Sequence, residues 1–327
     1  MKQTLTAQDA ALADIGRYLR AAGYDFTTAT PATHARVNAR GGNQMARSLA
    51  DVFGWSRPFE LRLLPAPLAA LAEKAGVLRP HGKAWRSAVR FSALGQLLFV
   101  HSAYPTDEAD VVFFGPDTYR FARVLKAMAS SRDLPSSVRI VDIGCGSGAG
   151  GIYLSHLFAK RCNVELVLGD INPQALRYSR INADLNECEA GLSVVASDVL
   201  NDIPGAADFI IANPPYLVDG AKRLYRHSGG EFGSELSLRI VAEALLRLEP
   251  GGQLILYTGS SIVDGKDQFL EAVRPILTKA GATYSYEEID PDVFGEELEQ
   301  EAYARADRIA VVALAAGLQR RTGHAST

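Results

Sequence analysis

The sequence predicts an α/β protein in which a mostly parallel sheet, covered by helices on both faces, follows a smaller, mainly helical α+β domain. Two observations predict this fold. Apolar segments with strand character alternate with amphipathic helical segments from about residue 138 onward. A glycine-rich turn follows the first of these strands, and acidic residues stand at successive strand ends. We therefore expect two domains, at residues 1–110 and 111–318.

The first domain is predicted to be a winged-helix-like accessory module that recognises the substrate. Thr6 can cap a first helix that ends before Gly23. The helical pattern recurs in three segments that end at Gly or Pro, at residues 43–54, 59–65 and 68–76. Two strands, 90–103 and 109–115, follow and are separated by a polar turn. Helices followed by a small hairpin are the outline of a winged-helix module.

The second domain alternates strands and helices. Helices are predicted at residues 115–130, 151–161, 173–187 and 234–252. Strands are predicted at residues 138–144, 164–170, 192–197, 207–212, 253–259 and 302–316. We expect the last strand to run antiparallel to the others. Residues 319–327 are predicted to be a disordered tail.

Charge is divided unevenly between the two halves of the chain. Residues 1–135 carry 17 Lys and Arg against 11 Asp and Glu, a net charge of +6, whereas residues 136–327 have a net charge of −9. Five cations between Lys74 and Thr106 meet no acid. This split favours an acidic partner such as nucleic acid for the first domain, with a solvated basic face as the alternative.

Composition argues against several other classes of protein. No apolar run approaches the roughly 18 residues of a membrane helix, and the N-terminus lacks a signal-peptide pattern, so we expect a cytoplasmic protein without a membrane partner. Cys145, Cys162 and Cys188 are odd in number and lack the spacing of zinc ligands. Neither a disulfide framework nor a metal site is expected, and no base that would activate Cys145 stands nearby in the sequence.

The glycine-rich turn predicts a nucleotide-binding site. It has the form Asp142-x-Gly144-x-Gly146-x-Gly148, between a strand and a helix. Glycines let the backbone turn sharply and let a ligand lie close to the amides. Asp170 ends the next strand, where a carboxylate can accept hydrogen bonds from both hydroxyls of a ribose, with Ile171 beside it.

The acid at the first strand end favours one cofactor over another. A nicotinamide dehydrogenase uses a similar turn, but Asp142 would repel its pyrophosphate, whereas it suits the cationic amino-acid end of S-adenosylmethionine. Asp198 follows the third strand, where it can accept a hydrogen bond from the adenine amine, with Val199 against the ring. Taken alone, Asp198 would equally be a turn or helix-cap residue.

The stretch Asn213-Pro214-Pro215-Tyr216 closes the fourth strand. The side-chain oxygen of Asn213 and the carbonyl of Pro214 can both accept hydrogen bonds from a target NH2 group and stabilise the charge that develops on it. Asn213 is also expected to contact the cofactor. The prolines fix this backbone shape, and Pro215 and Tyr216 can contact the substrate, the tyrosine by stacking on a planar group. The alternative is a simple turn, which explains the prolines but not all four residues.

With these motifs, residues 111–316 resemble a class I S-adenosylmethionine-dependent methyltransferase with a Rossmann-like sheet, in the NPPY branch that methylates planar nitrogens. The segments VDIGCGSGAGGI, GDINPQALRYSRINA and NPPY, with HSGGEFGSELSLRIVAEALLRLEPGGQLIL, are most similar to the HemK-like family of release-factor glutamine methyltransferases. That family has a Pro-Arg-x-x-Thr-Glu stretch where this chain keeps Pro116, Asp117 and Thr118. Thr118 is then either a cofactor contact or a helix cap.

The resemblance implies an N-methyltransferase acting on a macromolecule. A protein glutamine amide is the first expectation, and an adenine-N6 or guanine-N2 amine of RNA or DNA is the alternative. Arg223, Arg226 and His227 would lie in a loop facing the substrate or on a solvated surface. A nicotinamide dehydrogenase is opposed by Asp142, and a non-catalytic nucleic-acid-binding protein by Asn213 and Asp142.

Overall fold

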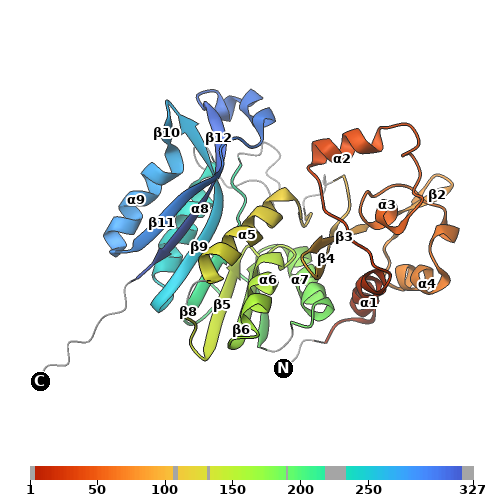
Figure 1. Cartoon of the computed structure of the whole chain (residues 1–327), viewed down its shortest axis with the longest axis horizontal. Coiled ribbons are helices and arrows are strands. Elements are labelled where there is room, and N and C mark those ends of the chain that lie inside the picture. Colours follow the sequence, from red (N-terminus) through yellow and green to blue (C-terminus); the bar gives the residue numbers. More distant parts are fainter. Residues whose placement is uncertain (1–3, 106–109, 131–132, 189–190, 218–232, 319–327) are drawn as a thin grey trace, which may run out of the picture.

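The computed structural model describes residues 4–105, 110–130, 133–188, 191–217 and 233–318. The predicted tail, residues 319–327, and the three side chains Arg223, Arg226 and His227 lie outside the described residues. In Figure 1 the N-terminal domain lies beside the sheet domain, and helix α7 of the sheet domain lies between them.

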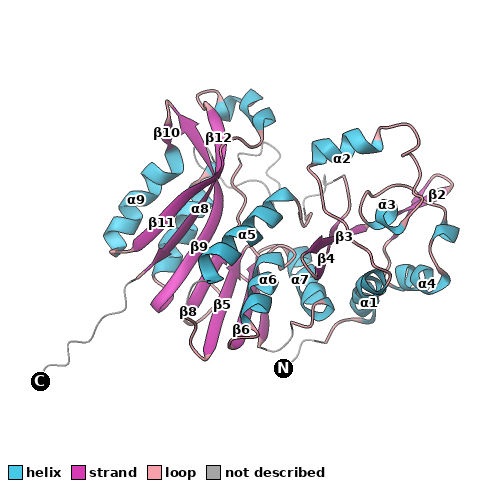
Figure 2. Cartoon of the chain, in the orientation of Figure 1, coloured by secondary structure: helices cyan, strands magenta, loops and turns pink. Residues whose placement is uncertain are grey.

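The N-terminal domain consists of short helices and two hairpins (Figure 1, Figure 2). Its helices are α1 (Ala7–Ala21), α2 (Pro31–Asn38), α3 (Leu49–Phe53) and α4 (Ala66–Lys74), with a 3-10 turn η1 (Leu61–Leu63). Its hairpins pair β1 (Leu78–His81) with β2 (Ala84–Ser87), and β3 (Val89–Leu94) with β4 (Leu97–Ser102). Thr6 caps α1 as predicted, accepting a hydrogen bond from the Asp9 backbone N–H.

Several predictions for this domain are wrong in detail. The single strand expected at residues 90–103 is a whole hairpin, which turns at Gly95 with a φ of 62°. Residues 110–115 form no strand. The helix expected at 59–65 is only the turn η1, and of 43–54 only α3 is helical. Helix α2 and the first hairpin were not predicted, although Thr30 caps α2 and proline occupies its first position, which are ordinary start signals.

The second domain contains the predicted sheet, with strand order β11-β12-β9-β8-β5-β6-β7. Its strands are β5 (Ser137–Ile143), β6 (Asn163–Asp170), β7 (Leu192–Ala196), β8 (Ala207–Ala212), β9 (Leu248–Val263), β11 (Thr283–Asp290) and β12 (Arg308–Gly317). The pairs from β9 through β8, β5 and β6 to β7 are parallel, and β12 is antiparallel to both of its neighbours. The mostly parallel sheet with an antiparallel last strand is confirmed. The short β10 (Lys266–Asp267) pairs with β9.

Helices cover both faces of this sheet. One set is α5 (Pro116–Ser130), α6 (Ala149–Phe158) and α7 (Pro173–Leu185), and the other is α8 (Glu235–Leu245) and α9 (Gln268–Ala280) (Figure 2). Adjacent residues of β5 point to different cores: Ile140 belongs to the core that includes Phe121 of α5, and Val141 belongs to the core that includes Ile240 of α8. This alternation is the two-residue period of a strand buried on both faces. Helix α9 and β11 were not predicted.

Two asparagines join the domains, Asn182 within α7 and Asn186 at its C-terminal end. Asn182 accepts a hydrogen bond from the Val100 backbone N–H at 2.7 Å and donates one to the Val100 carbonyl at 2.9 Å. Asn186 does the same to Leu98, at 3.1 and 2.9 Å. These side chains satisfy the backbone groups along one edge of β4, which would otherwise be buried without partners. The N-terminal core also extends onto α7 through buried residues such as Tyr178. The accessory domain is therefore fixed relative to the sheet.

Across the described residues, the model contains no helix whose length and apolar character would suit a membrane span.

Candidate active site

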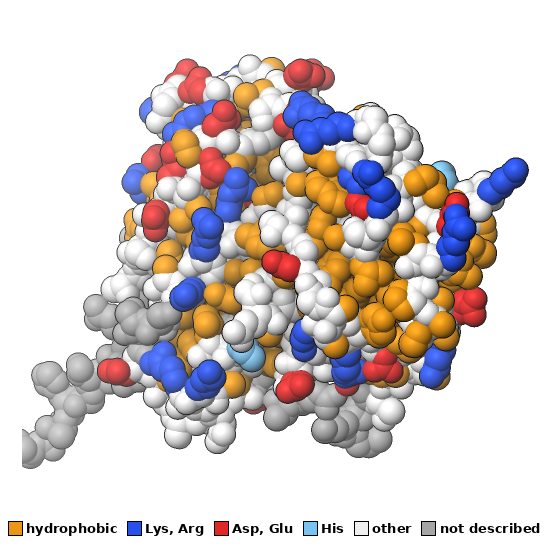
Figure 3. Space-filling model, turned by 45° about the vertical axis from the view of Figure 1, so that its right-hand side comes forward, with side chains coloured by type: hydrophobic (Ala, Val, Ile, Leu, Met, Phe, Trp, Pro, Cys, Tyr) orange, Lys and Arg blue, Asp and Glu red, His pale blue; other side chains and the backbone are white. Residues whose placement is uncertain are grey.

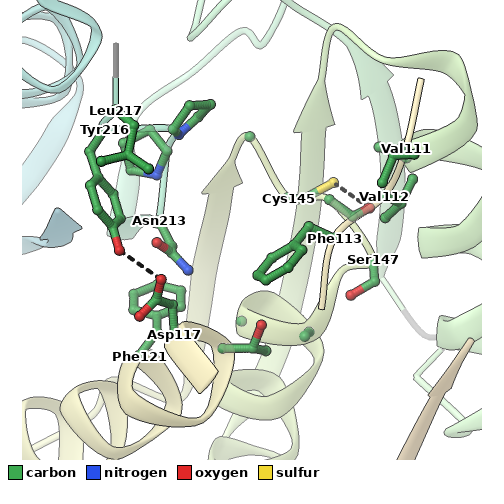
Figure 4. A pocket seen from close by; sticks show the side chains of 18 of the residues that line it. Val111, Val112, Phe113, Asp117, Phe121, Cys145, Ser147, Asn213, Tyr216 and Leu217 are labelled. Atoms are coloured by element: carbon green, nitrogen blue, oxygen red, sulfur yellow. Dashed lines mark hydrogen bonds between the residues drawn. The ribbon is translucent and has the colours of Figure 1, made fainter. Parts of the chain in front are cut away.

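A cavity of about 690 Å³ lies at the carboxyl ends of the parallel strands. Its wall includes nearly every residue predicted for the cofactor and the methyl acceptor: Asp142, Gly144, Gly146, Asp170, Ile171, Asp198, Val199 and Asn213 to Tyr216. Parallel strands end at one edge of a sheet, so residues far apart in sequence meet there. Figure 4 shows Asn213 on one side of this cavity and the glycine-rich turn with Cys145 on the other.

The glycine-rich turn forms the floor of the cavity. Gly144, Gly146 and Gly148 have φ angles of 63°, 54° and 76°, which residues other than glycine rarely adopt. A Cβ added to Gly144 or Gly146 would meet no atom within 4 Å, so both face open space. Gly148 differs, because its Cβ would come within 3.4 Å of Leu168, Ile152 and Ser179. We interpret Gly148 as the position that lets α6 approach the sheet, since it does not line the cavity.

Asp142 is a buried carboxylate beside the floor of the cavity. Its Oδ2 accepts a hydrogen bond from the Gly151 backbone N–H at 2.7 Å, near the start of α6. Burial raises the pKa of Asp142 to about 7, partly offset by this hydrogen bond, and the neighbouring Asp170 raises it further. A cation in the cavity would favour the ionised form. The cationic amino-acid end of S-adenosylmethionine therefore fits this wall.

Asp170 joins the floor of the cavity to the start of α7. Its two carboxylate oxygens accept hydrogen bonds from the backbone N–H groups of Gly146 and Asn172, both at 2.9 Å. Burial raises the pKa of Asp170 and these hydrogen bonds lower it. Ile171 leaves 55% of its surface exposed in the same wall, unusual for a large apolar residue next to a buried strand end. An apolar, flat surface beside a carboxylate suits a nucleoside.

Asp198 lines the cavity but is also held from outside it. Arg239 of α8 donates two hydrogen bonds to its carboxylate, one of them at 3.1 Å. The side chain is about half exposed. Val199 follows with a φ of 53°, and its side chain is buried. A contact of Asp198 with the adenine amine thus stays a prediction, and it would share the carboxylate with Arg239.

The NPPY segment leaves the end of β8 and enters the cavity wall. In Figure 4 the side chains of Asn213 and Tyr216 extend toward Asp117 on α5. The Tyr216 hydroxyl donates a hydrogen bond of 2.6 Å to Asp117 Oδ2, and Tyr257 of β9 donates one of 2.9 Å to Oδ1. Burial, followed by the Asp117 charge, raises the pKa of both tyrosines, which therefore remain donors. The predicted stacking of Tyr216 on the substrate stays a prediction for a ring whose hydroxyl is already engaged.

Asp117 is a site residue that sequence reasoning did not find. It is nearly fully buried and accepts hydrogen bonds from Tyr216, Tyr257 and Arg120, the last at 3.1 Å. Arg120 also donates to Asp290 at the end of β11, at 2.9 Å. An acid in the first turn of a helix is common, so the sequence carried no signal beyond the local Pro116-Asp117-Thr118 similarity. Only the fold shows that this acid holds the NPPY segment.

Other predicted residues have simpler surroundings. Thr118 accepts a hydrogen bond from the Gly115 backbone N–H at 3.3 Å, which is a helix-start contact, and it also lines the cavity. Cys145 is buried, and burial raises the pKa of its thiol well above the usual range, so it is a poor nucleophile at neutral pH. Among the described residues, no His, Cys, Asp and Glu side chains are grouped so that they could hold a metal ion.

The N-terminal domain closes one side of the same cavity. Thr30, Pro31 and Ala32 at the start of α2 line it, as do Tyr104 and Pro105 after β4. No local motif marks these positions, and α2 is absent from the sequence prediction, so this part of the site was not expected. The site is therefore shared between both domains.

Comparisons with known proteins find similarity over part of this chain. Residues 122–273 match the family model described as Methyltransferase small domain. The Ribosomal RNA small subunit methyltransferase C of Pasteurella multocida is 36% identical over 127 residues, which are 39% of this chain and 34% of that protein. The Release factor glutamine methyltransferase of Mycolicibacterium smegmatis is 32% identical over 135 residues, 38% of this chain and 47% of that protein. Among solved structures, Trm5b from Pyrococcus abyssi is 17% identical, with a TM-score of 0.48 over 77% of this chain and 70% of its own.

This chain spans about a third of the first of these two curated relatives and about half of the second. The similarity to a release-factor enzyme, expected from the motifs, is accompanied by similarity to ribosomal RNA enzymes. The matched region contains β5 to β9 and the strand-end residues described above. The region that the family model matches is therefore similar to methyltransferase domains. It forms a mostly parallel, Rossmann-like sheet with helices on both faces.

Proposed function

We propose that this chain is an N-methyltransferase that transfers a methyl group from S-adenosylmethionine to a planar NH2 group of nucleic acid, with an RNA base as the first candidate. One observation carries the proposal: residues Asn213 to Tyr216, which follow β8, line the same cavity as the glycine-rich turn and Asp170. Two acceptors for an NH2 group thus lie beside the predicted cofactor position.

The chemistry needs positioning more than a strong base. Bound S-adenosylmethionine supplies an activated methyl group on a sulfonium. The Asn213 side-chain oxygen and the Pro214 carbonyl accept hydrogen bonds from the NH2 group, orient its lone pair toward the methyl carbon and stabilise the positive charge that develops on nitrogen. The carbon–sulfur bond breaks as the nitrogen–carbon bond forms. The methylated nitrogen then loses its proton to water.

Charge and similarity support a nucleic acid as the carrier of this NH2 group. The first 135 residues have a net charge of +6, although the whole chain is acidic, at −3. The N-terminal domain, which holds most of these cations, forms one side of the cavity. Several curated relatives, from Pasteurella multocida and from Serratia proteamaculans among others, are named ribosomal RNA methyltransferases.

A glutamine amide of a protein is the second candidate. It is planar and carries the same NH2 group, so Asn213 and Pro214 would treat it alike. The similarity to the Release factor glutamine methyltransferase of Mycolicibacterium smegmatis favours it. The choice between the two therefore depends on the parts of the protein that contact the rest of the substrate.

Tritiated S-adenosylmethionine and an extract of cells that lack the gene would test the proposal. We expect label in macromolecules with the parent protein and none with Asn213→Ala, and we expect RNase to release it. If only protease releases the label, the methyl acceptor is a protein glutamine amide and not an RNA base. Equal labelling by the parent and Asn213→Ala would remove Asn213 from the mechanism and contradict N-methyl transfer at this site.

A further inference from the structure

We infer that residues 31–47, helix α2 and the loop after it, form a cationic arm that binds the phosphate backbone of a nucleic acid whose target base lies in the cavity. This inference rests on the proposed function, because it names the surface that would recognise an RNA substrate. We call this segment the α2 arm.

The α2 arm begins at the cavity itself. Thr30, Pro31 and Ala32 line the cavity that also contains Asn213. Helix α2 has eight residues, and at about 1.5 Å per residue it extends roughly 12 Å from this rim. Nucleic acid carries a phosphate about every 3.4 Å along each strand of a duplex. The arm therefore covers the distance of a few nucleotides from a base held in the cavity.

The charged side chains of the arm are all arginines. Arg36, Arg40 and Arg47 are exposed, and no acid occurs between Asp25 and Asp51. Within the described part of the chain, none of these three guanidinium groups forms an ion pair with a carboxylate. Figure 3, which turns the N-terminal domain forward, shows Lys and Arg side chains on the upper part of that domain, where Figure 1 places α2.

Four arginines on the sheet domain each have a carboxylate partner. Arg139 pairs with Glu165, Arg239 with Asp198, Arg274 with Glu271 and Arg308 with Glu288. A surface arginine with a carboxylate neighbour adds little long-range field, whereas unpaired cations of one sign attract a polyanion from a distance. The helix dipole explains at most Arg36, which lies in the last turn of α2, since Arg40 and Arg47 lie beyond the helix.

Contacts with Trp55 and Tyr104 anchor helix α2 to the rest of the N-terminal domain. His34 is completely buried, and its Nε2 lies 2.8 Å from the Trp55 carbonyl, to which the Asn38 amide also donates at 2.9 Å. The His34 ring centroid lies 4.2 Å from that of Tyr104, which lines the cavity. His34 is the buried residue of α2, Val37 and Asn38 are partly buried, and Arg36 is exposed. A helix anchored by His34 and Asn38 presents its cations at a constant position beside the cavity.

His34 does not supply the charge. Burial, then the nearby Arg90, lowers the pKa of His34 to about 4, so the ring is neutral at physiological pH. The positive charge of the arm therefore comes from arginines, which do not titrate between pH 6 and 8. Nucleic-acid binding through this arm should depend strongly on salt and not on pH in that range.

The test compares two triple variants of the full chain. In the first, Arg36→Gln, Arg40→Gln and Arg47→Gln remove the cations of the arm. The control removes the same charge from exposed positions around α9 on the sheet domain, through Lys266→Gln, Arg274→Gln and Lys279→Gln. Binding of a fluorescent single-stranded RNA is measured from 50 to 300 mM KCl, and calorimetry with S-adenosylhomocysteine shows whether each variant keeps its cofactor site.

We expect the arm variant to bind the RNA about tenfold more weakly, and the slope of log affinity against log salt to fall by about 2, since each lost contact to a single strand contributes roughly 0.7. The control variant should bind like the parent, and both variants should keep the parent's affinity for S-adenosylhomocysteine. A parent that does not bind RNA, or an arm variant with the parent's affinity and slope, would overturn the inference.

Methyl transfer separates this inference from the proposed function. If RNA is labelled and the arm variant keeps the parent's KM for it, the arm assignment fails and the proposed function stands. If the arm variant loses RNA affinity while the label of the parent enters only protein, the arm binds nucleic acid but the proposed acceptor is wrong.

Discussion

The proposed cofactor side and the proposed acceptor side of the cavity are held in place by different kinds of contact. The cofactor side consists of one continuous turn with the ends of two adjacent strands, held by backbone N–H groups that donate to Asp142 and Asp170. The acceptor side is held by side chains, with Asp117 of α5 bound to Tyr216 after β8 and Tyr257 of β9. Backbone contacts within one motif are local, whereas the side-chain contacts join residues more than 90 positions apart.

The difference teaches where each half is vulnerable. A substitution in the cofactor half should change how tightly the cofactor binds. A substitution in the acceptor half should leave cofactor binding in place and change the rate of transfer, because the NPPY segment would lose its position. Four measurements test this distinction between the two halves of the cavity.

The largest effect is expected for Asn213→Ala. Removing the side-chain acceptor leaves the Pro214 carbonyl alone to orient the NH2 group, so kcat should fall about 10²- to 10³-fold. The dissociation constant of S-adenosylhomocysteine, measured by calorimetry, should stay within about twofold of the parent's value. A variant that lost cofactor affinity instead would show that Asn213 belongs to the cofactor half.

A loss of cofactor affinity is expected for Asp170→Ala. The substitution removes the acceptor for the ribose hydroxyls and the hydrogen bonds to Gly146 and Asn172 that shape the turn. Hydrogen bonds to charged groups contribute about 1.5–3 kcal/mol each, so the affinity should fall about 10- to 100-fold. At saturating cofactor, kcat should recover. Calorimetry showing parental affinity would contradict the ribose assignment.

A smaller change in rate is expected when the hydrogen bond from Tyr216 to Asp117 is removed. Tyr216→Phe removes one hydrogen bond to Asp117 and keeps the ring, and kcat should fall roughly tenfold with cofactor affinity retained. Tyr257→Phe is the matched control, since it removes a different hydrogen bond of Asp117 without touching the NPPY segment. Asp117→Asn keeps the size of the side chain and should lie between them. A Tyr216→Phe variant that keeps the parent's kcat would show that the hydrogen bond to Asp117 has no positioning role.

The smallest effect is a dependence of cofactor affinity on pH. The pKa of Asp142 is raised to about 7, and a bound cation favours its ionised form, so affinity should rise between pH 5 and 7 and then level off. Asp142→Asn should make cofactor affinity less dependent on pH between pH 5 and 7.

Without cofactor, the raised pKa of Asp142 means that the folded protein binds this proton more tightly than the unfolded chain, so stability should fall as pH rises from about 4 to 7. Thermal unfolding of the parent and the variant across this range measures it.

The sequence by itself determined the sheet and most of the cofactor half. Strand and helix periodicity predicted the alternation from residue 138 onward, and Asp142, Asp170 and Asn213 stand at strand ends that parallel pairing must bring together. The N-terminal domain was predicted less well. Its short elements are stabilised by packing on α7, as the hydrogen bonds of Asn182 and Asn186 to β4 show, and local propensity does not record such contacts.

Only the tertiary structure decided the surroundings of the acceptor. Asp117 resembles any acid in a first helical turn until the fold brings Tyr216 and Tyr257 to its two oxygens. Arg36 resembles any surface cation until α2 is placed at the rim of the cavity. The physical reason is the separation in sequence over which each kind of interaction acts. Backbone periodicity and turn chemistry act over a few residues and are written in the local sequence, whereas a buried hydrogen bond between distant segments exists only after the chain has packed.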